Sequence, residues 1–214
     1  MAASAQLRWI LPLAAVAVLP AVLTPRPRGA PPVEGSYALD SGPLTYGPSA
    51  SGPDRALIEG AIARSRPEAR EVADQILGLT KVEIGDPGQG VAGETSWENG
   101  RFTMVLNLGL VDRLLGRRGT DRLVMHELGH VVDLALTGPE LDKKLDLQTP
   151  RGFGCANGTN GACAAPRERF AEGFSKWSTG DIGAQAGAVL GYQIPPPSDL
   201  ERWGRDLVSG IQNR

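Results

Sequence analysis

Both histidines of this 214-residue chain lie in one short segment, residues 126–130, which reads His-Glu-Leu-Gly-His. The surrounding sequence predicts a helix that begins near Thr120, a suitable N-cap residue, and ends at the Thr-Gly-Pro stop signal of residues 137–139. Apolar residues recur along one side of this helix, at Val124, Leu128, Val131 and Ala135. The fold must therefore bury that side, and the two histidines, four residues apart, share a face of the same helix.

The spacing of the two histidines is typical of a metal site. From one helix face, His126 and His130 can each direct a ring nitrogen at the same ion. Glu127 follows His126 directly, where it can reach a water bound to that ion and act as a general base. Because this is the pattern of zinc hydrolases, we expect Zn²⁺ as the cofactor. The alternative is a pair of helix-surface histidines that hold no ion.

A catalytic zinc ion takes three protein ligands and keeps one open position. The chain has no third histidine, so the remaining ligand must be a carboxylate, unless a cysteine serves. We expect Glu168, in a helix that opens with Pro166, to be this ligand. Glu172 lies one turn later on the same face, where it could accept the free ring N–H of a ligand histidine. The alternative is two solvated glutamates on a surface helix.

Two further acidic residues near the histidines are candidates for the same site. Asp133 lies three residues after His130 on the histidine side of the helix, so it is another candidate to accept a ring N–H. A solvated aspartate near a helix end is the alternative. Glu140 is a poorer candidate ligand, because it lies at the start of a loop only ten residues after His130.

The order of the predicted elements indicates an α+β fold, with helices first, then a few strands, then helices. An Asn-Gly pair at 99–100 predicts a hairpin between its flanking strands, and a Ser-Arg-Pro-Glu capping box predicts a helix start at Ser65. Residues 137–165 are expected to form a long loop of the kind that carries function. The predicted helices are 54–64, 65–77, 108–116, 120–137, 166–177, 181–190 and 198–213, and the predicted strands are 80–85, 93–97 and 101–107.

The N-terminal part of the chain has the composition of a targeting segment. Arg8 precedes an uncharged run, residues 9–23, that is shorter than the ~20 residues a membrane span needs. We interpret residues 1–30 as a signal peptide or a membrane anchor, residues 31–53 as a flexible linker rich in Pro, Gly and Ser, and residues 54–214 as the folded domain. The protein is therefore expected to be secreted or anchored at the extracellular face of the membrane.

The cysteines and the charge balance add two constraints. Cys155 and Cys163 bracket a short polar loop that a disulfide could close in an oxidising compartment, and the alternative is two unrelated thiols. The chain has 22 Lys and Arg against 24 Asp and Glu, a net charge of -2. This balance excludes a strongly basic nucleic-acid binder. The expected partner is a peptide or protein substrate, with membrane contact only through an N-terminal anchor.

The two motifs, at residues 126–133 and 168–174, together resemble the catalytic domains of anthrax lethal factor and its relatives. These are zincin metallopeptidases of the gluzincin type, in which a glutamate is the third zinc ligand. The resemblance implies that the two histidines and Glu168 bind zinc, that Glu127 is the catalytic base, and that Glu172 supports a ligand. It covers roughly residues 95–180 and is specific at its two motifs.

The family resemblance also implies an architecture. A small sheet and the active-site helix would lie on one side of a cleft, with a helical C-terminal half across it. The hairpin strand 101–107 would then be an edge strand that pairs with an extended substrate. The chain departs from the family at one place: no tyrosine lies between His130 and Glu168, where the family has one that stabilises the oxyanion.

Peptide hydrolysis by this site still needs a donor for the oxyanion. We expect Tyr192 to supply it, because the prolines at 195–197 could turn it back toward the site, and a packing tyrosine is the alternative. The predicted function is an exported zinc-dependent endopeptidase. One alternative is a zinc-binding scaffold or interaction module that has the fold without turnover, and another is hydrolysis of a cell-wall peptide.

Overall fold

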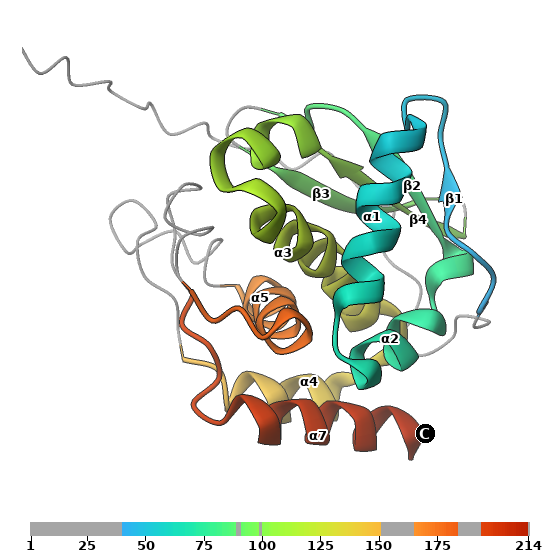
Figure 1. Ribbon diagram of the computed structural model, residues 1–214. Coiled ribbons are helices and arrows are strands. Elements are labelled where there is room, and N and C mark those ends of the chain that lie inside the picture. Colours follow the sequence, from blue (N-terminus) through green and yellow to red (C-terminus); the bar gives the residue numbers. More distant parts are fainter. Residues whose placement is uncertain (1–39, 89–90, 99, 151–164, 184–193, 214) are drawn as a thin grey trace, which may run out of the picture.

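The computed structural model confirms an α+β fold, with one four-stranded sheet and helices packed beside it (Figure 1). The sheet lies on one side of the long helix α3 (Leu108–Leu136), and α5 (Pro166–Thr179) lies on the other side. Helix α3 is therefore the central element of the domain. The structure describes residues 40–88, 91–98, 100–150, 165–183 and 194–213. Three predicted site residues, Cys155, Cys163 and Tyr192, lie outside these ranges.

The sheet has the strand order β1-β2-β4-β3. Strands β3 (Gly93–Glu98) and β4 (Arg101–Leu106) form the predicted antiparallel hairpin, and Gly100 takes the positive φ of 81° that its turn requires. Strand β2 (Thr80–Ile84) pairs in parallel with β4 on its other side. The prediction that strand 101–107 forms the sheet edge is therefore wrong, because β2 covers β4 and leaves β3 as the edge.

The folded domain begins earlier than the sequence indicated. Strand β1 (Thr45–Tyr46) pairs in parallel with β2, inside the range assigned to the linker. Ser51 then caps helix α1 (Gly52–Arg64), because its side chain accepts a hydrogen bond from the Asp54 backbone N–H. The Pro, Gly and Ser content of this stretch predicts a linker. A two-residue strand and a single capping residue are too short to leave a recognisable pattern in the sequence.

The second helix, α2 (Pro67–Asp74), begins with proline in its first turn, as predicted, but Ser65 does not cap it. The Ser65 hydroxyl instead donates to the backbone carbonyl of Ile62, at the end of α1. This hydroxyl therefore closes the preceding helix rather than opening the next one. A 3-10 turn, Leu77–Leu79, joins α2 to strand β2.

Helix α3 joins the two helices that the sequence predicted separately. The side chain of Asn107 caps its start, and non-helical backbone at Gly116 (φ 62°, ψ −162°) bends it. Thr120 lies inside the second part, where its hydroxyl donates to the Gly116 carbonyl, so it is not the N-cap. The helix ends at Thr137, as predicted.

The C-terminal helices surround α3 on the side away from the sheet (Figure 1). Helix α4 (Pro139–Asp146) occupies part of the region predicted as a long loop, which was wrong there because an eight-residue helix carries little apolar periodicity. Helix α5 begins at Pro166, as expected, and α7 (Leu200–Gln212) begins after Asp199, whose side chain caps it. Within the described residues, no helix is both long and apolar enough to cross a membrane.

The apolar core extends from the sheet through α3 to the C-terminal helices. Strand β4 buries alternate side chains against α3, and α5 and α7 add a cluster of aromatic rings. The central members are Phe102, Met104, Leu106, Val124, Leu128, Val131, Phe170, Phe174, Trp177 and Trp203. Because both sides of α3 are covered, the polar residues on this helix are buried with it, which sets the conditions for the site.

Candidate metal centre

Three predicted ligands come together between α3 and α5. The Nε2 atom of His126 lies 3.4 Å from Glu168 Oε2, and the Nε2 atom of His130 lies 3.5 Å from Glu168 Oε1. One donor atom from each residue lies within 4.8 Å of the others. The two imidazole rings stand edge to face, with centroids 4.9 Å apart. The sequence prediction for these three residues therefore agrees with where the structure places them.

The separations of these donor atoms fit a small divalent ion. A tetrahedral zinc ion with bonds of about 2.0–2.1 Å would space its ligand atoms by about 3.3–3.4 Å. The two nitrogen-to-oxygen distances of 3.4 and 3.5 Å are close to this spacing, although they end on different oxygens of Glu168, and one donor atom from each of the three residues lies within 4.8 Å of the others. Two imidazoles and one carboxylate are also a donor set that zinc uses in catalytic sites. The residues present therefore fit a three-ligand zinc site.

The close approach of α3 and α5 depends on a glycine within the motif. A Cβ atom at Gly129 would lie 2.9 Å from the Cα atom of Ala171 and 3.2 Å from its carbonyl oxygen. Real Cβ atoms do not approach backbone atoms that closely, so only glycine lets the two helices meet here. The hydroxyl of Ser175 adds a hydrogen bond of 2.8 Å to the Arg122 carbonyl. These contacts hold the helix that carries Glu168 against the helix that carries both histidines.

Glu127 lies on the side of α3 that faces the edge strand β3. Its carboxylate accepts a hydrogen bond from the Thr95 hydroxyl at 2.7 Å. Gly93 lies so close that a Cβ there would be 2.4 Å from Glu127 Oε1. Burial raises the pKa of Glu127 to about 7, against the opposing effects of His126 and the Thr95 hydroxyl. A carboxyl with such a pKa can both take up and release a proton near neutral pH.

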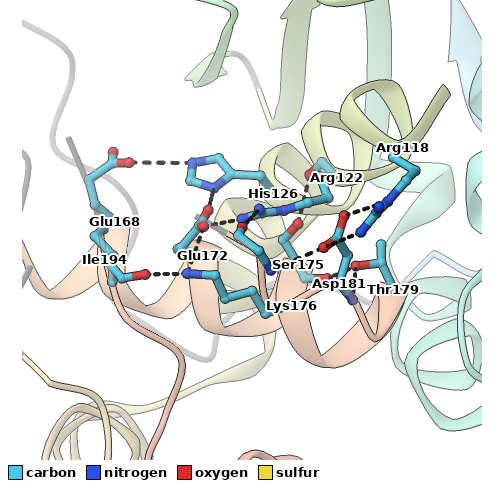
Figure 2. Close-up of polar contacts among 11 residues, drawn as sticks. Arg118, Arg122, His126, Glu168, Glu172, Ser175, Lys176, Thr179, Asp181 and Ile194 are labelled. Atoms are coloured by element: carbon cyan, nitrogen blue, oxygen red, sulfur yellow. Dashed lines mark hydrogen bonds and ion pairs between the residues drawn. The ribbon is translucent and has the colours of Figure 1, made fainter. Parts of the chain in front are cut away.

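Glu172 contacts the ring nitrogen of His126 that faces away from Glu168, as the sequence predicted. The Nδ1–H of His126 donates to Glu172 Oε2 at 3.3 Å, which leaves Nε2 directed at Glu168 (Figure 2). Arg122 and Lys176 both contact the other carboxylate oxygen of Glu172. Burial alone would raise the pKa of Glu172, but His126, Arg122 and Lys176 hold it well below its usual range.

The surroundings of the two histidines shift their pKa values in opposite directions. Burial opposes the charged form of His126, but hydrogen bonds to Glu168 and Glu172 outweigh it and raise the pKa of this ring to about 10. Burial, together with the positive charge of His126, lowers the pKa of His130 to about 4. Near neutral pH, His126 is therefore protonated and positively charged, and His130 is neutral. A dication bound at the Nε2 atom of His126 would displace the proton from that nitrogen.

The remaining candidates lie away from the three ligands. Within the described residues, the hydrogen-bond partners of the Asp133 carboxyl are Thr137 and Asp142, so the predicted contact with a ligand histidine is not found. Burial and Asp142 raise the pKa of Asp133 to about 8. Both carboxyls line a cavity of about 130 Å³ between α3, α4 and α5. Glu140 is exposed in the first turn of α4.

Four residues that sequence analysis did not single out contribute to this site. Thr95 and Gly93 contact Glu127, and Arg122 and Lys176 contact Glu172. The two cations carry a sequence signal that could have been used. Lys176 lies four residues after Glu172, and Arg122 lies four before His126, so each shares a helix face with a predicted site residue. Strand residues 93 and 95 carry no such signal, because the sheet brings them in from a distant part of the chain.

Comparison of the chain with family models, with curated proteins and with solved structures gives no match. Function must therefore be inferred from the side chains themselves. These provide two imidazoles and a carboxylate that could hold a metal ion, a buried glutamate beside them, and a group of charged side chains that contacts His126 through Glu172.

Proposed function

We propose that the protein is an exported zinc-dependent endopeptidase of the gluzincin type. The observation that supports the proposal most directly is the convergence of His126, His130 and Glu168, from two helices, with one donor atom from each within 4.8 Å of the others. The proposed zincin fold is consistent with an α+β domain whose histidine helix lies between a small sheet and a set of helices. The uncharged run at 9–23 supports export.

The division of labour among the residues follows from their surroundings. Zinc at the three ligands would lower the pKa of a coordinated water toward ~7 and polarise the scissile carbonyl. Glu127, with a pKa raised to about 7, takes a proton from the attacking water and passes it to the leaving amine. The Thr95 hydroxyl directs the Glu127 carboxylate, and Glu172 keeps the His126 ring in the tautomer that presents Nε2.

Strand β3 provides a place for the substrate main chain. It pairs with β4 on one side, and among the described residues no strand pairs with its other edge, where a strand could be added. Gly93 and Thr95 in this strand contact Glu127, which places the edge beside the proposed base. An extended peptide could add to this edge by main-chain hydrogen bonds. Strand β3, and not strand 101–107, is therefore the proposed partner of the substrate main chain. Tyr192 remains the predicted donor for the oxyanion.

The competing proposal is a zinc-binding module that does not turn over substrate. The sequence feature that favours it is the absence of a tyrosine between His130 and Glu168. The raised pKa of Glu127 favours the enzyme, because a structural glutamate gains nothing from a buried position with one hydroxyl partner. Glu127→Gln separates the two proposals.

The experiment measures zinc content by elemental analysis and cleavage of a peptide library, with and without a chelator, for the full chain and for Glu127→Gln. In the variant we expect zinc at the wild-type ratio and a kcat lower by about 10²–10⁴-fold, the contribution of a general base. The matched control, Glu140→Gln, changes an exposed glutamate and should cleave normally. Wild-type protein that binds no zinc would contradict the metal site. Zinc binding without chelator-sensitive cleavage would favour the module.

A further inference from the structure

The carboxylate behind His126 is the centre of a buried network of charges (Figure 2). One oxygen of Glu172 accepts from His126, and the other contacts both Arg122 and Lys176. The side chains of Arg122 and Lys176 are only 5% and 2% exposed. Two cations therefore surround one carboxylate, in a place where a lysine is seldom found without a partner.

Each of the two cations also binds the main chain at a second point. Arg122 donates to the backbone carbonyl of Gly183, and Lys176 donates to the backbone carbonyl of Ile194. Gly183 and Ile194 are the described residues on either side of 184–193. Asp181 accepts from the Gly183 N–H and from Arg118, which ties the same stretch of chain from outside (Figure 2).

A buried ion network of this kind is costly when it serves stability alone. Apolar side chains of similar volume often replace buried ion pairs without loss, because burial removes the hydration of each charge. Here the same two side chains do something that an apolar side chain could not do. They fix a carboxylate against a ligand histidine, and they bind two carbonyls that are distant in sequence.

We propose that Arg122 and Lys176 are positioning residues of the metal centre: they orient Glu172 toward His126 and link that orientation to the main chain at Gly183 and Ile194. Zinc binding and the position of the chain at these two carbonyls are then coupled through one carboxylate. This inference rests on the proposed metal site at His126, His130 and Glu168. It assigns no catalytic contact to either cation.

The principal test is Lys176→Met in the full chain, with Lys144→Met as the matched control. Lys144 makes the same kind of ion pair, but its side chain is 54% exposed and it pairs with Asp206, outside this network. Zinc affinity is measured by competition with a chromophoric chelator, and ligand geometry by the visible spectrum of the Co²⁺ form. We expect Lys176→Met to weaken zinc binding by about tenfold, the lower end of the range for groups that orient metal ligands, and to shift the Co²⁺ spectrum. Lys144→Met should change neither.

Hydrogen exchange provides a readout that does not involve catalysis. In the wild-type protein, zinc should slow the exchange of backbone amides near Gly183 and Ile194. In Lys176→Met, zinc should no longer slow exchange near Ile194. Zinc binding, Co²⁺ spectrum and protection all equal to wild type in this variant would overturn the inference while leaving the metal site standing. Wild-type protein that binds no zinc would overturn the proposed function.

A second variant covers the case in which Lys176→Met does not fold, which circular dichroism would reveal. Arg122→Lys keeps a positive charge near Glu172, but one ammonium group cannot reproduce the two contacts that the guanidinium makes with Glu172 and Gly183. We expect faster exchange near Gly183 and a changed Co²⁺ spectrum. Wild-type behaviour in both measurements would again overturn the coupling.

Discussion

The two sides of helix α3 each bury a glutamate, yet they give it opposite properties. Toward the sheet, Glu127 is 3% exposed and has the Thr95 hydroxyl as its hydrogen-bonding neighbour, and its pKa is raised to about 7. Toward α5, Glu172 is 7% exposed and contacts His126, Arg122 and Lys176, and its pKa is held well below its usual range. Burial is nearly the same, so the charged partners decide the acidity.

This difference corresponds to the two tasks that a metal-dependent hydrolase needs. A general base must exchange a proton near neutral pH. On the sheet side of α3, the contact described for the Glu127 carboxylate is a neutral hydroxyl rather than a cation, and its pKa is raised to about 7. A carboxylate that orients a ligand must stay charged, and the α5 side provides that with two cations. Glu127 of α3 and Glu172 of α5 therefore suit different tasks, because they lie on opposite sides of α3 in different environments.

The largest expected effect is on the ligand side, in Glu168→Ala. The carboxylate of Glu168 reaches the Nε2 atoms of both histidines, so its removal leaves two imidazoles and no third ligand. We expect zinc to be absent from the purified variant, as measured by elemental analysis, and cleavage to be lost with it. Glu140→Ala, on the surface of α4, is the control and should keep its zinc. A variant at position 168 that still holds one zinc per chain would contradict the ligand assignment.

A smaller effect, confined to the base side, is expected for Gly93→Ala. The added methyl group would lie 2.4 Å from Glu127 Oε1, so the carboxylate must move away from its present position. We expect kcat to fall by about 10²-fold, the scale of a displacement of about 1 Å at a reacting group, with zinc content unchanged. Gly85→Ala is the matched control, because its nearest contact would be an ordinary 3.8 Å to Val105. Equal loss of activity in both variants would show a general effect on the sheet.

The smallest effect concerns stability rather than chemistry, in Asp133→Asn. Burial and Asp142 raise the pKa of Asp133 from 3.8 to about 8, so the folded protein binds a proton there that the unfolded chain has released. This group therefore lowers stability progressively as pH rises from 4 to 8, and no further above that range. We expect the Tm of the variant, relative to wild type, to rise between pH 5 and pH 8. A difference in Tm that stays constant over this range would contradict the raised pKa.

The positions of the candidate site residues could be predicted from the sequence where they depend on helix spacing. The pairs His126 with His130 and Glu168 with Glu172 lie four residues apart, and a single turn of helix brings each pair to one face. The stop at residue 137 and the start at Pro166 were predictable for the same local reason.

The sheet edge and the contacts of Glu127 could not be predicted from the sequence, because they depend on which strands become neighbours. The family resemblance implied that strand 101–107 lies at the sheet edge, and nothing local in the sequence shows that β2 pairs beside β4 in parallel. The contacts of Gly93 and Thr95 with Glu127 follow from that arrangement. The position of Ser65 shows a different limit, because a hydroxyl between two helices can bond to either one.

The contact between Gly129 and Ala171 also limits how the proposed metal site can respond to different ions. Since main-chain atoms meet there with no side chain between them, the separation of the two helix backbones cannot be adjusted by a change of rotamer. Bonds from Ca²⁺ to oxygen are about 2.3–2.6 Å long, longer than the bonds of about 2.0–2.1 Å that zinc makes to histidine nitrogen. Any adjustment to a larger ion must therefore come from the side chains of His126, His130 and Glu168, and not from the backbones that carry them.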